Sequence, residues 1–147
     1  MRPGIVVRME ARYELFDHTA DIGARVVAPT LDALARTAVE ALYGVIGSLA
    51  VAGSGESARF AYQGDDAAVM IRDWLADLLV EFESHGRCLT DVVVESFDGA
   101  HLRAAGVFRA IDASRSEFHR EVKAVTYHEL ALRTVDGGYE LVFIVDI

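Results

Sequence analysis

The chain has 147 residues, of which 52% are hydrophobic, with 23 acidic against 14 basic side chains and a formal net charge of −9. This length predicts one globular domain with a single hydrophobic core, and the apolar content excludes an intrinsically disordered chain. Because so negative a surface repels phosphate backbones, we expect no direct tight binding of RNA or DNA, and basic partners or cations are favoured instead.

The compartment is predicted from cysteine content and from the lengths of the apolar runs. The single cysteine, Cys88, has no second cysteine with which to form an internal disulfide. The segment after Met1 is too short for the apolar region of a signal peptide, and no apolar run approaches the roughly 18 residues that span a bilayer. These features predict a soluble cytoplasmic protein without a membrane partner.

The N-terminal third predicts a pair of strands followed by a helix. Residues 13–16 and 22–28 are rich in aromatic and β-branched side chains and lie on either side of a polar stretch. Thr30 has the position of an N-cap before apolar residues that recur at helical spacing. This predicted helix ends at Gly44 or Gly47.

The middle of the chain predicts a second helix. Residues 51–57 are small and glycine-rich, which is typical of a loop, and residues 58–62 form a short predicted strand. Asp65 or Asp66 then provides an N-cap for a helix that runs to about Ser84 with an apolar stripe along one side.

The C-terminal half predicts two β-hairpins. Residues 92–97 and 102–111 form the first, and residues 122–135 and 139–147 form the second, around the turn Asp136-Gly137-Gly138. Two helices placed among hairpins, without regular β-α-β alternation, predict an α+β fold in which the helices pack on antiparallel β-sheet hairpins in a single domain.

A polar turn near the N-terminus holds the first candidate site residues. Asp17, His18 and Asp21 lie close together between the first two predicted strands, so their side chains can converge. Two interpretations stay open at this point. The aspartates either bond to the backbone of the turn or act as ligands.

The end of the chain holds a second group of carboxylates. Residues 141–145 are apolar at every position, as in a strand covered on both faces, yet Asp146 and Ile147 follow directly. The Asp146 side chain and the α-carboxylate of Ile147 repel each other unless a cation or a donor compensates. Such oxygen ligands suit Ca²⁺ or Mg²⁺. The alternative is a frayed, solvated chain end.

Five segments together resemble one known family. They are Tyr13–Gly23, the capped helix from Thr30, Asp-Trp-Leu-Ala-Asp-Leu-Leu at residues 73–79, Glu-Val-Lys-Ala-Val-Thr-Tyr-His at residues 121–128, and the final Asp146-Ile147. In this order they resemble the archease family. The resemblance assigns residues 12–147 to an archease-like domain and leaves residues 1–11 as an N-terminal lead without an assigned function.

The resemblance implies a non-enzymatic accessory function. Members of that family activate a GTP-dependent tRNA-splicing RNA ligase, which joins 2′,3′-cyclic-phosphate or 3′-phosphate ends to 5′-hydroxyl ends, by promoting its guanylylation and multiple turnover. The resemblance also implies a divalent metal site, with Ca²⁺ favoured over Mg²⁺, formed by Asp21, Asp146 and the carboxylate of Ile147. Asp17 and His18 are weaker members of this set.

Two other functions stay open from the residues alone. One is a metal-dependent phosphoester or nucleotide hydrolase with Asp17 or His18 as the base, although the sequence has neither a Walker-type phosphate loop nor a nucleophile elbow. The other is a structural interaction module whose carboxylates only stabilise the fold.

Further side chains admit both a functional and a structural interpretation. Lys123 bridges the carboxylates of the implied site or lies solvated at a strand edge, and His128 is an accessory ligand, a proton carrier or a structural histidine. The acidic stripe, defined as Asp73, Asp77 and Glu81, docks a basic partner or is an ordinary exposed helix face.

Overall fold

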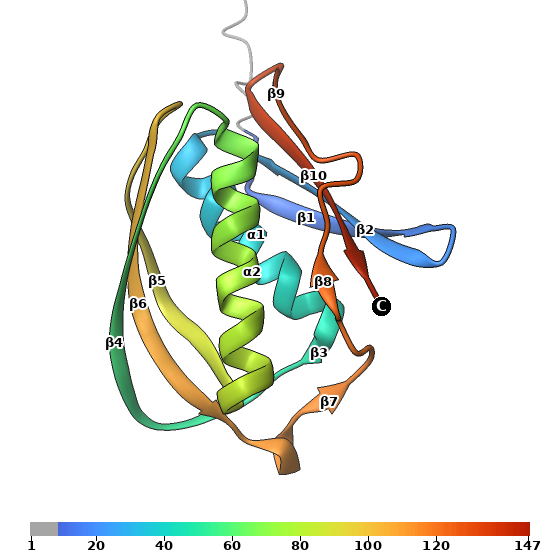
Figure 1. The fold of residues 1–147 in the computed structure, drawn as a ribbon, viewed down its shortest axis with the longest axis vertical. Coiled ribbons are helices and arrows are strands. Elements are labelled where there is room, and N and C mark those ends of the chain that lie inside the picture. Colours follow the sequence, from blue (N-terminus) through green and yellow to red (C-terminus); the bar gives the residue numbers. More distant parts are fainter. Residues whose placement is uncertain (1–8) are drawn as a thin grey trace, which may run out of the picture.

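Two helices form the middle layer of the molecule, between two antiparallel β-sheets (Figure 1). The computed structural model describes residues 9–147, so most of the predicted N-terminal lead of residues 1–11 lies outside the described residues. The helices are α1 (Leu31–Ile46) and α2 (Ala67–His85). The large sheet contains β1 (Arg12–His18), β2 (Asp21–Ala28), β8 (Ala124–Val125), β9 (Ala131–Val135) and β10 (Gly138–Asp146).

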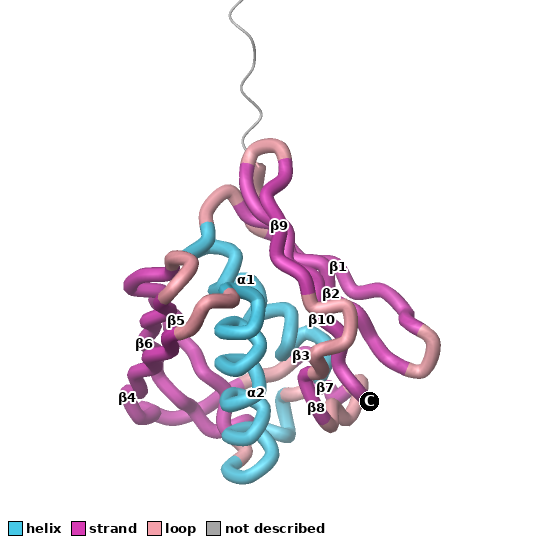
Figure 2. The backbone as a smooth tube through the Cα atoms, turned by 45° about the horizontal axis from the view of Figure 1, so that its top comes forward, coloured by secondary structure: helices cyan, strands magenta, loops and turns pink. Residues whose placement is uncertain are grey.

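A second sheet covers the other side of the helices (Figure 2). The strand order in this sheet is β4-β6-β5. In addition, β3 and β7 form a two-stranded sheet near the end of α1. The bounds are β3 (Gly47–Ser48), β4 (Val51–Gln63), β5 (Arg87–Phe97), β6 (His101–Ile111) and β7 (Glu117–Phe118), with a 3-10 turn at Ala113–Arg115. The predicted α+β class, two helices packed on antiparallel hairpins, is confirmed.

The large sheet presents one apolar face to the helices. Alternate residues of β2 and β10 pair on that face, including Ile22 with Val145 and Ala24 with Phe143, and all four side chains are buried. Because successive side chains point to opposite sides of a strand, the intervening residues lie on the outer face. Trp74 of α2 is fully buried in the core between the sheets.

Helix α1 begins as predicted and ends at the later of the two candidate glycines. The Thr30 hydroxyl accepts a hydrogen bond from the Ala33 amide at 3.1 Å, as an N-cap does. Gly47 is the C-cap. Gly44 lies inside the helix instead, where a Cβ atom would come within 2.3 Å of the Tyr13 hydroxyl oxygen, so this glycine makes room for the ring of Tyr13.

The loop prediction for residues 51–57 is wrong, because β4 begins at Val51. Gly53 and Gly55 have positive φ angles of 87° and 78°, and the pairing with β6 shifts between Ala52 and Glu56. The two glycines form a β-bulge, which shifts the register without ending the strand. Because of this shift, the segment lacks the regular alternation of apolar residues by which a strand is predicted.

The continuous strand predicted over residues 122–135 is also wrong. Only Ala124–Val125 and Ala131–Val135 are strands, and residues 126–130 form a loop between them. The backbone amide and the hydroxyl of Thr126 both donate to the Ile144 carbonyl, at 2.9 and 3.0 Å. Glu129 then takes a positive φ of 53°, which lies outside the β region, in the turn between these two strands.

The single cysteine lies inside the molecule. Cys88 is buried at the start of β5, and its burial raises the pKa of the thiol to about 12. A thiol so protonated is a poor nucleophile, so Cys88 acts as a small apolar residue. No helix within residues 9–147 has the length and apolar content needed to cross a membrane.

The N-cap of α2 gives a test of the local structure. The Asp66 carboxylate accepts hydrogen bonds from the amides of Ala68 and Val69 at 3.0 and 3.2 Å. Asp66→Ala leaves these amides unpaired, so we expect the free energy of unfolding in urea to fall by about 1 kcal/mol. The neighbouring exposed Asp65 is the matched control, and Asp65→Ala should change it by less than about 0.5 kcal/mol. An equal loss of unfolding free energy in both variants would show that Asp66 does not stabilise α2 as its N-cap.

Candidate metal centre

The register between β2 and β10 brings Asp21 and Asp146 side by side. The antiparallel pairs run from Tyr139 with Ala28 to Val145 with Ile22, and the next pair in this register is Asp146 with Asp21. Directly opposed residues share one face of the sheet, with Cβ atoms about 4.5–5.5 Å apart. Two carboxylates separated by 125 positions in the sequence therefore become neighbours.

A third strand fixes the end of β10. Asp146 pairs with Ala124 of β8, and the Lys123 amide donates to the Asp146 carbonyl at 2.8 Å. Lys123 therefore precedes the strand and contacts the site through its backbone. Its side chain is exposed. The side chain of Ile147 packs against the core, which anchors the residue that follows Asp146.

The structure brings His18 to the same face and separates Asp17 from it. His18 pairs with Asp21 across the β1–β2 hairpin, so His18, Asp21 and Asp146 lie on the outer face of the sheet. Asp17 instead pairs with Ile22, whose side chain is buried on the face toward the helices. Alternation therefore directs Asp17 away from the other predicted ligands.

The chemistry of Asp21 and Asp146 suits a hard cation. Within residues 9–147 neither carboxylate forms an ion pair with a basic side chain. Two adjacent carboxylates without a counter-charge repel each other, and oxygen ligands on a partly exposed surface match the coordination of Ca²⁺. The residues present therefore fit a divalent ion, and the predicted ligand set of Asp21, Asp146 and Ile147 stays a prediction.

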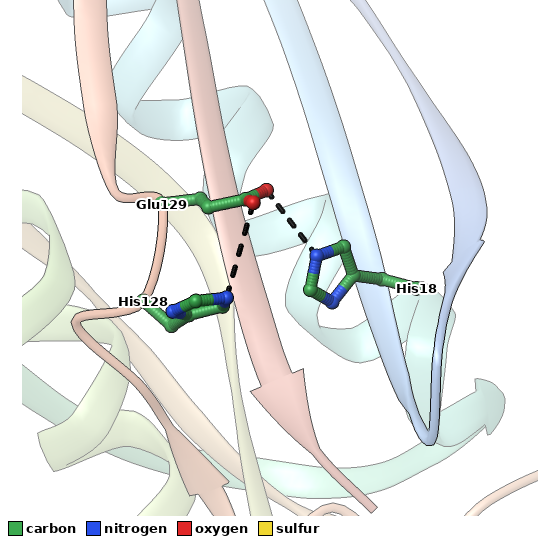
Figure 3. Close-up of side chains that lie close together, drawn as sticks. All are labelled: His18, His128 and Glu129. Carbon is green, nitrogen blue, oxygen red and sulfur yellow. Dashed lines mark ion pairs between the residues drawn. The ribbon is translucent and has the colours of Figure 1, made fainter.

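The hairpin end also meets the loop between β8 and β9. Nε2 of His18 lies 3.3 Å from the carboxylate of Glu129, and the rings of His18 and His128 have centroids 5.3 Å apart (Figure 3). Nδ1 of His18 is buried and has no hydrogen-bond partner among the described residues, so the ring makes its polar contact through Nε2. Glu129 was not identified from the sequence, where it follows a His in a run that reads as a strand.

Arg72 of α2 holds the first part of this loop in place. Its Nε donates to the Val125 carbonyl at 2.9 Å, and its Nη1 donates to the Tyr127 hydroxyl at 2.9 Å. The guanidinium also lies over the Tyr127 ring, 4.2 Å from the centroid. We call these contacts of Arg72 with Val125 and Tyr127 the Arg72 clamp. It could not be predicted from the sequence, because the two partners lie more than 50 positions from Arg72.

The acidic stripe of α2 is engaged within the molecule. Asp73 accepts from Arg72 at 2.8 Å, Asp77 accepts from the Tyr62 hydroxyl, and Glu81 accepts from Arg87 at 2.7 Å. The hydrogen bond from Arg87 lowers the pKa of Glu81. These partners favour the structural interpretation of the stripe over a docking face.

Comparison with known proteins decides the family. The model of the Archease protein family (MTH1598/TM1083) matches residues 13–147. The chain belongs to the archease family. Protein archease of Methanopyrus kandleri is 31% identical over 138 residues, covering 92% of this chain and 99% of its own. Protein archease of Archaeoglobus fulgidus is 30% identical, with the same two coverages.

Solved archease structures share the fold. The solution structure of protein 1598 from Methanobacterium thermoautotrophicum matches with a TM-score of 0.71 and 26% identity, covering 92% of this chain and 98% of that one. An archease from Thermotoga maritima, described as a possible chaperone, matches in fold with a TM-score of 0.65, covering 90% of this chain and 94% of that one. That description applies to the Thermotoga maritima protein, which is 22% identical to this chain, and its match shows that the fold is shared.

The Arg72 clamp predicts how the loop depends on α2. In Arg72→Ala the Val125 carbonyl and the Tyr127 hydroxyl lose a charged donor, so we expect the free energy of unfolding to fall by about 1–3 kcal/mol. We also expect faster hydrogen exchange of the Thr126 amide. Arg59→Ala is the control, because the Arg59 side chain is 79% exposed and, within residues 9–147, forms an ion pair with Glu95 alone. If the Thr126 amide exchanges at the same rate in both variants, Arg72 does not hold the loop in place.

Proposed function

We propose that this archease is a metal-binding accessory protein that activates a GTP-dependent tRNA-splicing RNA ligase by promoting its guanylylation and multiple turnover. We further propose that it holds Ca²⁺, or less favourably Mg²⁺, between Asp21, Asp146 and the carboxylate of Ile147. The observation that carries the metal site is the β2–β10 register, which makes Asp21 and Asp146 cross-strand neighbours. The ligase as partner rests on the family.

A metal ion at this position would connect the hairpin to the end of β10. Asp21 begins β2 immediately after the β1–β2 turn, and Asp146 ends β10. Charge compensation would remove the repulsion between the two carboxylates and hold the hairpin end in one position. A surface with this fixed shape would then be available to the ligase.

The protein's net charge supports the accessory role. With a net charge of −9, direct capture of the RNA substrate is disfavoured, whereas a basic protein that binds RNA would be attracted. The protein would therefore act on the ligase and not on the RNA.

A turnover assay tests the proposed function. Substoichiometric wild-type protein should increase multiple turnover by a GTP-dependent RNA ligase on RNA with 3′-phosphate and 5′-hydroxyl ends. We expect Asp21→Ala and Asp146→Ala to lose at least about tenfold of this stimulation, the effect typical of a weakened metal site. Asp65→Ala removes an exposed carboxylate that precedes the N-cap of α2, and it should leave the stimulation unchanged.

Two outcomes would change the conclusion. Full stimulation by both site variants would remove the metal site from the mechanism. Hydrolysis of a nucleoside 2′,3′-cyclic phosphate by the purified protein, lost in Asp21→Asn, would support the alternative of a metal-dependent hydrolase.

Thermal melting with and without Ca²⁺ tests the metal site without the ligase. A ligand that binds only the native state at 100 times its Kd stabilises it by about 2.7 kcal/mol. We therefore expect the wild-type Tm to rise by several degrees with Ca²⁺, and we expect no rise for Asp146→Asn. The same titration with Mg²⁺ determines which ion is preferred.

A chain extension tests the contribution of Ile147. A short Gly-Ser extension after Ile147 replaces the α-carboxylate with a peptide bond, so it should reduce the Ca²⁺-dependent rise in Tm. The same extension added before Met1 is the matched control. A full rise in the C-terminally extended protein would exclude the terminal carboxylate as a ligand while leaving Asp21 and Asp146 in place.

A further inference from the structure

We propose a second metal site, distinct from the carboxylate pair, in which Nε2 of His18, Nε2 of His128 and the carboxylate of Glu129 bind one Zn²⁺ ion. The three side chains are drawn in Figure 3. One ligand atom from each lies within 4.8 Å of the other two. The site does not depend on ligase activation, and it differs from the site proposed above in its donor atoms and in the ion that these atoms select.

The two distances from the histidines to the Glu129 carboxylate are near those of a zinc site. Nε2 of His18 lies 3.3 Å from one oxygen of Glu129, and Nε2 of His128 lies 3.8 Å from the other. Zinc binds nitrogen and oxygen at about 2.0–2.2 Å, so two ligands of a tetrahedral site are about 3.3–3.5 Å apart. Small rotations of the side chains would bring all three ligand atoms to bonding distance from one ion.

The backbone positions the three ligands before any ion binds. His18 ends β1, where it pairs with Asp21 across the hairpin. His128 and Glu129 lie in the β8–β9 loop, which is held by the Thr126 hydrogen bonds to Ile144. The loop is thus fixed to β10, next to the hairpin.

The backbone conformation of Glu129 is energetically unfavourable. Its φ of 53° is unusual for a residue other than glycine, and residues in such conformations cost roughly 1–3 kcal/mol and cluster at ligand sites. In this structure the conformation places the Glu129 carboxylate within reach of both histidines.

The donor set selects the class of ion. Two imidazole nitrogens with one carboxylate favour Zn²⁺ and its transition-metal neighbours, whereas Asp21 and Asp146 offer only oxygen and favour Ca²⁺. The side chains of His128 and Glu129 are 62% and 55% exposed. Three protein ligands at an exposed position leave the fourth coordination position open to water or to a group on a partner.

A zinc titration with matched variants tests the site. The full-length protein, without a histidine tag and stripped with EDTA, is titrated with Zn²⁺ against a chromophoric zinc chelator. We expect one Zn²⁺ per chain. We also expect His128→Ala and Glu129→Gln each to weaken the affinity by more than about tenfold, the loss that follows when only an outer-shell partner is removed.

His85 provides a control that matches His128 in exposure and in pairing. Both side chains are 62% exposed, and Nδ1 of His85 lies 3.2 Å from the Glu81 carboxylate, but the metal cluster does not include His85. His85→Ala should therefore retain the full zinc affinity. Glu129→Gln keeps the size of the loop side chain, so its result holds even if His128→Ala perturbs the loop.

Asp146→Asn separates the two sites. It should leave zinc affinity unchanged while it removes the Ca²⁺-dependent rise in Tm, and His128→Ala should do the reverse. The proposal is overturned if His128→Ala and Glu129→Gln bind Zn²⁺ as tightly as the wild type, which would leave an ordinary His–Glu ion pair. Equal loss of zinc affinity in Asp146→Asn and in His128→Ala would also overturn it, because zinc would then occupy the carboxylate pair.

Discussion

The antiparallel pairing of β2 with β10 is the contact on which the rest of the structure depends. It joins the first hairpin of the described chain to the last strand and buries one face of both strands against the helices. Because the side chains alternate, the same pairing fixes which residues face outward. A slip of one residue would turn Val145 outward and Asp146 toward the core, so burial of the apolar face also specifies the position of the carboxylates.

The loop at residues 126–130 depends on this sheet and on α2 together. Thr126 bonds to the Ile144 carbonyl, and Arg72 bonds to Val125 and Tyr127 from the helix side. The path of the loop is therefore fixed from two sides, by β10 and by α2. This explains how Glu129 can hold a left-handed backbone conformation in a short connection between two strands.

Two different sets of donors consequently lie at one end of the large sheet. Asp21 and Asp146 come from adjacent strands and offer oxygen alone, whereas His18, His128 and Glu129 join the hairpin to the loop and offer nitrogen as well. Coordination chemistry would separate the ions of the two proposed sites, because hard cations prefer oxygen and Zn²⁺ accepts nitrogen. The acidic helix face, in contrast, is largely occupied by Arg72, Tyr62 and Arg87.

The sequence by itself determined the α+β class, the N-cap Thr30 and the turn before β10, and it narrowed the N-cap of α2 to Asp65 or Asp66, because caps and turns depend on neighbours a few positions away. The first half of β4 could not be predicted, because the glycine bulge interrupts the alternation of apolar and polar residues. Only the tertiary structure decided that Asp17 faces away from Asp21 and that Glu129 meets His18, since strand register and loop path arise from contacts between residues far apart in the chain.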